Sequence, residues 1–150
     1  MTAVLRVALG LLFLAAGLIH LVLSSMAVYE AVESEGWSTT AGEITSAKVL
    51  SGRSSRPAVE YVFQVSEKRY VGSRREIKDY GAGRTAADTV LAEYPVGSRI
   101  KVYFDPSDPT RSVLKPGITP FLAGWPALST LLAGMGTVIL LKGRRAKSDA

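Results

Sequence analysis

The chain has 150 residues, the usual length of one domain, and its formal net charge is +5. The absence of cysteine excludes a disulfide framework and a thiolate metal site. Most of the net positive charge comes from the two ends of the chain, because the middle part has nearly balanced charges. The composition therefore does not indicate a nucleic-acid-binding face, and no nucleic acid is expected as a partner.

Two apolar runs without formal charge lie near the ends of the chain, at residues 7–29 and 120–141. About 20 apolar residues in a helix cover the hydrocarbon core of a bilayer, so each run predicts a membrane-spanning helix. The first helix is expected to continue to about Gly36, a typical C-cap residue. A cleaved signal peptide is the alternative for the first run, because "SSMA" ends in small residues. The length of the run and the interrupting His20 favour an uncleaved anchor.

Basic residues follow the second run in the tail "KGRRAKSDA". By the positive-inside rule this end is expected in the cytoplasm, and two spans place the N-terminus on the same side. The chain then divides into four parts. These are a first membrane helix with its extension at 1–36, an extracytoplasmic β-rich domain at 37–118, a second membrane helix at 119–142 and a basic cytoplasmic tail at 143–150.

The middle part has the alternating pattern of short β-strands. Apolar residues at every second position from Val59 to Val65 are typical of a strand with one buried face. Residues 68–77 are expected to return from the turn "SEK" as the hairpin partner of that strand. The other predicted elements are a strand at 41–50, a short helix at 84–94, an alternating strand at 98–105 and a last strand at 111–115.

These elements predict an α+β membrane protein. Two transmembrane helices would flank a small antiparallel β-sheet, or a partly closed β-barrel, with one short helix.

Three segments carry a resemblance to a known family. They are "WSTTAGEI" after the first run, "VEYVFQV" followed by "KRYVGS", and the most specific one, "YPVGSRIKVYFDPSDPTRSVLKPG". With them, the chain resembles over essentially its whole length a bacterial membrane-protein family known only as a numbered domain of unknown function (DUF3592). The resemblance implies an extracytoplasmic β-rich module between two anchors in the bacterial cytoplasmic (inner) membrane. It implies no catalytic residue and no cofactor.

Two aspartates in "DPSDP" stand three residues apart, each followed by a proline. Paired carboxylates are able to bind a hard cation or to share acid–base work. The neighbours favour a turn instead, because aspartate caps its own turn and proline cannot donate to a sheet ladder. The expected role is therefore structural, with no metal, for Asp105, Pro106, Asp108 and Pro109.

A local basic cluster is a candidate contact for an anion or a partner. It consists of Arg74, Arg75, Lys78 and Arg84. Interleaved acidic residues dilute it, and a solvated edge that discourages strand aggregation is the alternative. The segment "GAGRTA" at 81–86 matches G-x-G-x-x-A, but no buried strand leads into its glycines and the helix after it is short. A flexible connection is expected there.

His20 is the one ionisable residue inside a predicted span, and such residues carry a functional hypothesis. A lone histidine more often makes one interhelical hydrogen bond, here expected with Ser129 or Thr130. Small residues let membrane helices approach closely. The faces expected to pack together carry Gly10, Gly17, His20 and Ser24 on the first helix, and Ser129, Ala133 and Thr137 on the second.

These observations favour a non-enzymatic, membrane-anchored interaction or accessory module that presents a small β-domain outside the cytoplasmic membrane. Its expected partners are the lipid bilayer and another membrane or envelope protein, or a second copy of the chain, within a membrane complex. Two alternatives stay open. One is an envelope hydrolase using Asp105 and Asp108, with Glu93, and the other is a small proton-linked transport component centred on His20.

Overall fold

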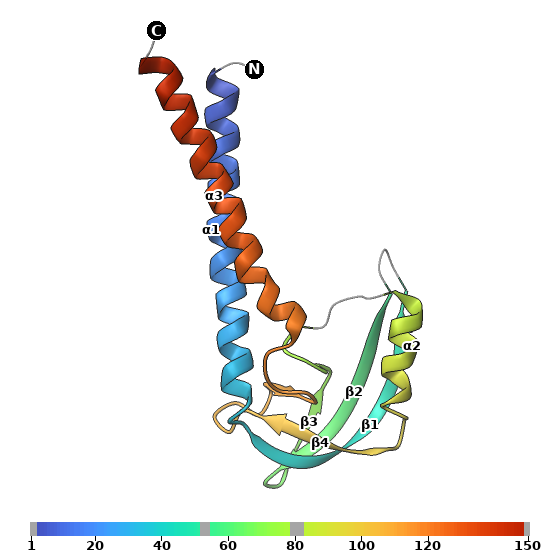
Figure 1. The fold of residues 1–150 in the computed structure, drawn as a ribbon. Coiled ribbons are helices and arrows are strands. Elements are labelled where there is room, and N and C mark those ends of the chain that lie inside the picture. The colour runs from blue at the N-terminus through green and yellow to red at the C-terminus, as the bar shows by residue number, and fades with distance from the viewer. Residues whose placement is uncertain (1–2, 52–54, 79–82, 149–150) are drawn as a thin grey trace. The chain divides into compact units, whose positions relative to one another are not determined.

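The computed structural model of the chain describes residues 3–51, 55–78 and 83–148 (Figure 1). Its contacts form two compact units, Met1–Tyr29 with Ile118–Ala150, and Glu30–Gly117. The elements follow in the order α1 (Ala3–Ser34), β1 (Ser38–Leu50), β2 (Arg56–Val65), β3 (Lys68–Gly72), α2 (Arg84–Ala92), β4 (Arg99–Phe104), β5 (Ser112–Val113) and α3 (Pro120–Ser148).

Helices α1 and α3 lie side by side and run antiparallel in the first unit (Figure 1). Both are long and apolar enough to cross a membrane, by length and composition. Only 17% and 11% of their most apolar stretches are buried within the protein. The two helices therefore cover little of each other's apolar surface, and a hydrocarbon environment would cover the rest.

The second unit is built on one antiparallel sheet with the strand order β3-β2-β1-β4-β5. Helix α2 lies along one face of this sheet (Figure 1). Together with the two candidate membrane helices, the sheet confirms the predicted α+β fold class. The buried cluster between the sheet and α2 consists of Ile44, Val59, Tyr61, Phe63, Tyr94, Val102, Phe104 and Leu114.

The two edges of the sheet approach each other at one end. The backbone N–H groups of Leu114 and Lys115, directly after β5, donate to the Arg75 carbonyl at 3.1 and 2.7 Å. Beneath this junction the fully buried Tyr61 donates its hydroxyl to the Arg74 carbonyl at 3.0 Å. These hydrogen bonds bridge the two edges at this end of an otherwise open five-stranded sheet.

The strand bounds differ from the prediction. β4 and β5 are shorter, at 99–104 and 112–113 instead of 98–105 and 111–115. β3 ends at Gly72 rather than at residue 77, because the Arg74 carbonyl accepts from the Tyr61 hydroxyl and the Arg75 carbonyl from the segment after β5, instead of from the backbone of β2. β1 begins at Ser38, earlier than residue 41, because its first residues pair with β4. The predicted helix at 84–94 is two residues shorter, since the backbone turns at Pro95.

Candidate functional site

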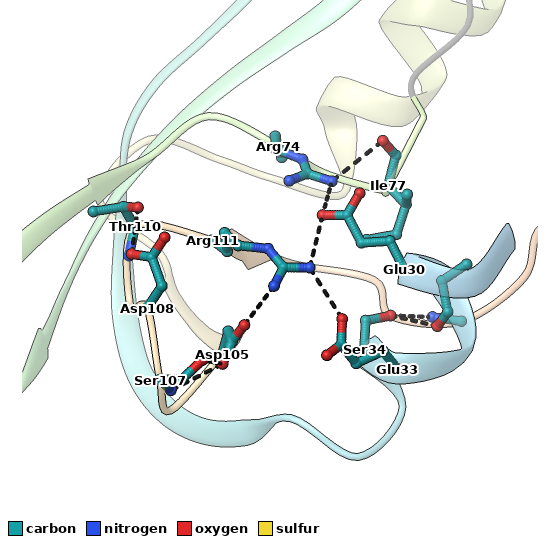
Figure 2. Close-up of polar contacts among 12 residues, drawn as sticks. Glu30, Glu33, Ser34, Arg74, Ile77, Asp105, Ser107, Asp108, Thr110 and Arg111 are labelled. Atoms are coloured by element: carbon teal, nitrogen blue, oxygen red, sulfur yellow. Dashed lines mark hydrogen bonds and ion pairs between the residues drawn. The ribbon is translucent and has the colours of Figure 1, made fainter. Parts of the chain in front are cut away.

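The strongest cluster of charges in the described domain surrounds Arg111, which lies between β4 and β5 (Figure 2). Its guanidinium donates from Nη1 to Asp105 Oδ2 at 2.6 Å and from Nη2 to Glu33 Oε2 at 3.0 Å. Nη2 also lies 3.5 Å from Glu30 Oε1. The same guanidinium sits 5.3 Å from the ring centroid of Trp37, which is buried. One arginine thus connects the last turn of α1, the start of β1 and the turn after β4.

A second arginine extends the cluster to the segment after β3. Arg74 Nη2 donates to Glu30 Oε1 at 2.9 Å (Figure 2). The chain's exit from the domain is fastened nearby, because the Gly117 N–H donates to Ser34 Oγ at 2.9 Å. We call these residues the base cluster of the domain: Glu30, Glu33, Ser34, Arg74, Asp105, Arg111 and Gly117.

Both aspartates of "DPSDP" cap turns. Asp105 Oδ1 accepts from the backbone N–H and the hydroxyl of Ser107 at 2.9 and 2.6 Å. Asp108 Oδ1 accepts from the same two groups of Thr110 at 3.1 and 2.6 Å. The two differ in surroundings, because the Asp105 side chain is 7% exposed and ion-paired, whereas Asp108 stands at the surface. The contacts that hold Asp105 are thus those of a turn and an ion pair.

The electrostatics of the base cluster favour the charged forms of Asp105 and Arg111. The Ser107 hydroxyl and backbone N–H, with a further contribution from the Arg111 guanidinium, hold the pKa of Asp105 below its usual value although burial opposes this. The hydrogen bond to Glu33, followed by the charges of Glu33, Glu30 and Asp105, raises the pKa of Arg111. Asp105 is therefore an ion-paired carboxylate rather than a carboxyl poised to accept a proton near neutral pH.

The lowered pKa of Asp105 predicts how stability depends on pH. The carboxylate contributes its full stabilisation above the unfolded-state value of about 3.9, and this contribution is lost as pH falls through the lower folded-state value. We expect the free energy of unfolding to decrease below about pH 4, and Asp105→Asn to weaken this dependence. Urea unfolding of the full chain in detergent at several pH values measures it, with Asp108→Asn as the matched control. Equal acid sensitivity of the Asp105→Asn variant and the natural chain would contradict the assignment.

The predicted basic cluster is divided by ion pairs. Arg74 pairs with Glu30, and Arg75 pairs with the adjacent Glu76. Lys78 is exposed, and Arg84 is exposed at the start of α2. The structure therefore does not bring these four side chains together as one free basic patch.

The segment "GAGRTA" lies partly outside the described residues, which resume at Gly83. From there the chain enters α2, a helix of 9 residues.

In the helix pair, His20 Nδ1 lies 2.6 Å from Ser129 Oγ. The Ser129 hydroxyl donates its one proton to the Trp125 carbonyl at 2.9 Å, so it accepts a hydrogen bond from His20 Nδ1–H. Close approach occurs at Gly17, where an added Cβ would lie 2.6 Å from the Ala133 backbone nitrogen. The polar contact thus sits beside the small residues that let the helices meet.

The other predicted packing residues are placed differently. An added Cβ at Gly10 would meet the Leu140 side chain at 2.7 Å, and Ser24 is buried with its hydroxyl bonded to the Leu21 carbonyl. Thr137, expected at the contact, is exposed and bonds back to the Ala133 carbonyl. Gly136 takes its place, since a Cβ there would lie 2.6 Å from the Leu14 backbone nitrogen.

The face of the sheet opposite the core is open to solvent in the described part of the domain. Val71 on the edge strand β3 is 67% exposed, and its cross-strand neighbour Val62 is half-buried. Three cations stand on the same face: Arg69 on β3, and Arg99 and Lys101 on β4. No sequence motif marks these three cations, although their alternation with buried residues on the same strands is a signal that they share one face. We call this surface the outer sheet face.

Among the described residues, no three His, Asp or Glu side chains are grouped closely enough to hold a metal ion. Residues 40–119 match the family described as a domain of unknown function (DUF3592). No curated protein matches the chain. The matched range runs from the first part of β1 to the residue before α3.

Proposed function

The chain belongs to the family described as a domain of unknown function (DUF3592), and this family carries no assigned activity. We propose that the protein is a non-enzymatic, membrane-anchored docking module. Its β-domain binds a partner protein through the outer sheet face and the adjoining edge strand β3. Helices α1 and α3 anchor it in the bacterial cytoplasmic membrane with both termini in the cytoplasm and the β-domain outside. In this role it serves as an accessory subunit of a membrane complex.

The observation that carries the proposal is the exposure of the outer sheet face at its edge. Val71 is 67% exposed on β3, a strand that has a pairing partner on one side only. Edge strands with free backbone groups and apolar side chains are sites where a second chain adds to a sheet. The opposite face carries the core under α2, so the outer face is the one that remains for binding.

The base cluster holds together, within the domain, the segments that flank the strands of this face. Arg111 and Arg74 tie the last turn of α1 to the segments that follow β4 and β3.

The contacts of the candidate residues favour docking over the two alternatives. The hydrolase hypothesis needs a free carboxylate at Asp105 or Asp108, but both accept two hydrogen bonds inside their own turns. The transport hypothesis centres on His20, and its Nδ1–H donates to Ser129 within the helix pair. This bond suits the structural role of a polar residue between membrane helices.

Photocrosslinking in the native membrane tests the docking proposal. A benzophenone amino acid in place of Val71 is expected to form one discrete adduct that copurifies in a fixed ratio with the chain. The same amino acid in place of Asp88, exposed on α2, is the matched control and is expected to form none. Adducts of equal yield at both positions, or none at position 71, would contradict docking at the outer sheet face.

A further inference from the structure

A shallow hollow of about 370 Å³ lies on the outer sheet face. It crosses four strands, from Arg69 on β3 to Arg99 on β4. Between these ends it is lined by residues of the two central strands, β2 and β1. The lining between the arginines consists of Ala41, Gly42, Glu43, Val62, Phe63 and Gln64.

The hollow has a positive charge at each end. Within the described part of the chain, Arg69, Arg99 and the neighbouring Lys101 take part in no ion pair, unlike Arg111 and Arg74 of the base cluster. Lys101 pairs with Ala41 in the register, so it stands beside the floor of the hollow. Glu43, the cross-strand partner of Arg99, is the one carboxylate in the lining. The charges thus favour an anionic ligand, with Glu43 weakening its hold at the Arg99 end.

The spacing of the two arginines indicates the shape of that ligand. Strands β3 and β4 are separated by β2 and β1, that is, by three strand spacings of about 4.8 Å. The register also offsets Arg69 from Arg99 by two residues along the strands, about 7 Å, so their backbones lie roughly 16 Å apart on a diagonal across the sheet. Residues four apart in an extended chain are separated by about 13 Å and point to the same side. The arginine side chains are long enough to lean inward over this difference, so two carboxylates about 13 Å apart on a segment that crosses the sheet diagonally would each meet one arginine.

The floor of the hollow suits the residue midway between those carboxylates. Ala41 and Gly42 are small, and Val62 offers a half-buried apolar side chain. The side chain at the third of five extended positions points to the same side as the first and the fifth. A small apolar side chain there would therefore lie on an apolar floor between two ionic contacts.

We propose that the hollow binds an acidic segment of a partner protein in extended conformation, with carboxylates four residues apart and a small apolar residue between them. The segment crosses the strands of the sheet, and its carboxylates accept hydrogen bonds from Arg69 at one end and Arg99 at the other. The inference rests on the proposed docking function and specifies the chemistry of the partner. Charge complementarity and the spacing of the arginines select the ligand.

Fluorescence anisotropy with the full chain in nanodiscs of neutral lipid tests the proposal. The probe is a labelled peptide with glutamates at its third and seventh positions and valine at the fifth. Its control has the same composition with glutamates at the third and sixth positions, which point to opposite sides of an extended chain. We expect the first peptide to bind at least threefold more tightly. Equal binding of the two peptides would overturn the proposal, because it would show that the hollow attracts negative charge without recognising the spacing of the two glutamates.

Variants of the chain locate the binding. The double variant Arg69→Glu with Arg99→Glu is expected to bind about tenfold more weakly, the loss of two exposed ion pairs. Replacement of both arginines by lysine keeps the charges and is expected to restore most of the affinity. Glu43→Gln removes the opposing carboxylate and is expected to tighten binding about twofold. Arg84→Glu, the same charge change on α2, is expected to leave affinity unchanged, and a comparable loss there would overturn the proposal.

Two further outcomes separate this inference from the docking function. If inorganic polyphosphate binds the hollow more tightly than the spaced peptide, the hollow recognises a polyanion and the proposed ligand is wrong. If neither peptide binds while benzophenone at position 71 still forms its adduct, the docking function stands and the acidic segment is wrong. The unfolding midpoint of each variant must match that of the natural chain, which the exposure of these positions leads us to expect.

Discussion

Replacement of Arg111 by methionine is expected to lower the free energy of unfolding of the β-domain by about 2–3 kcal/mol. Methionine keeps an apolar stem beside Trp37 but removes the cation from three carboxylates. Asp105, whose side chain is 7% exposed, would lose its only cation among the described residues. Removing one partner of a fully buried pair costs about 3–5 kcal/mol, and the lower value here reflects the 36% exposure of Arg111.

Pulse proteolysis of the full chain in urea measures this loss. Arg84→Met is the matched control, since it removes an exposed cation at the start of α2 and is expected to change stability by less than about 0.5 kcal/mol. If both variants lost the same stability, the base cluster would contribute no more than an ordinary surface charge.

Gly72→Ala is expected to destabilise the domain by about 3 kcal/mol, through overpacking of the core. An added Cβ at Gly72 would lie 2.3–2.6 Å from two ring carbons and the hydroxyl oxygen of Tyr61. The ring cannot withdraw easily, because Tyr61 is fully buried and its hydroxyl bonds to the Arg74 carbonyl at the junction of the sheet edges. The substitution would therefore displace the ring or open that junction.

The same proteolysis measurement tests the effect with two comparisons. Gly36→Ala is the control, because a Cβ there would meet only the Glu33 carbonyl oxygen at 3.6 Å, an ordinary contact. Tyr61→Leu combined with Gly72→Ala should cost less than the sum of the two single changes, since the smaller side chain makes room. Additive losses would show that the ring and the glycine do not compete for space.

The sequence predicted the sheet through its alternation. Val59, Tyr61 and Phe63 lie on the buried face because a strand turns successive side chains to opposite sides. The end of β3 could not be predicted in the same way. It depends on the Tyr61 hydroxyl reaching the Arg74 carbonyl, a contact that only the folded sheet creates.

The packing of the helix pair was predictable in type but not in register. The sequence predicted that residues spaced by four, from Ser129 through Ala133 to Thr137, all face the first helix. An α-helix has 3.6 residues per turn, so seven residues come within about 20° of two full turns, whereas eight overshoot by about 80°. Gly136, seven residues after Ser129, therefore faces α1 and Thr137 does not.

The base cluster could not be predicted from sequence patterns. The turn preferences of aspartate and proline indicate a turn at Asp105 from local chemistry alone. The ion pair of Arg111 with Glu33 joins residues 78 positions apart, so it depends on the path of the whole domain between them. The hollow on the outer sheet face also depends on the folded domain, because Arg69 and Arg99 become its two ends only when four strands align.

The hydrogen bond from the Gly117 N–H to Ser34 Oγ has a topological consequence. It brings the point where the chain enters the β-domain to the point where it leaves. A flexible connection of about 80 residues between two helices would carry a closure entropy of about 4 kcal/mol. The folded domain closes that loop by itself, so the two helices are joined as if by a short turn. The β-domain is in this sense an insertion between two helices. Another domain whose two ends lie equally close together could replace it without changing the connection between the helices.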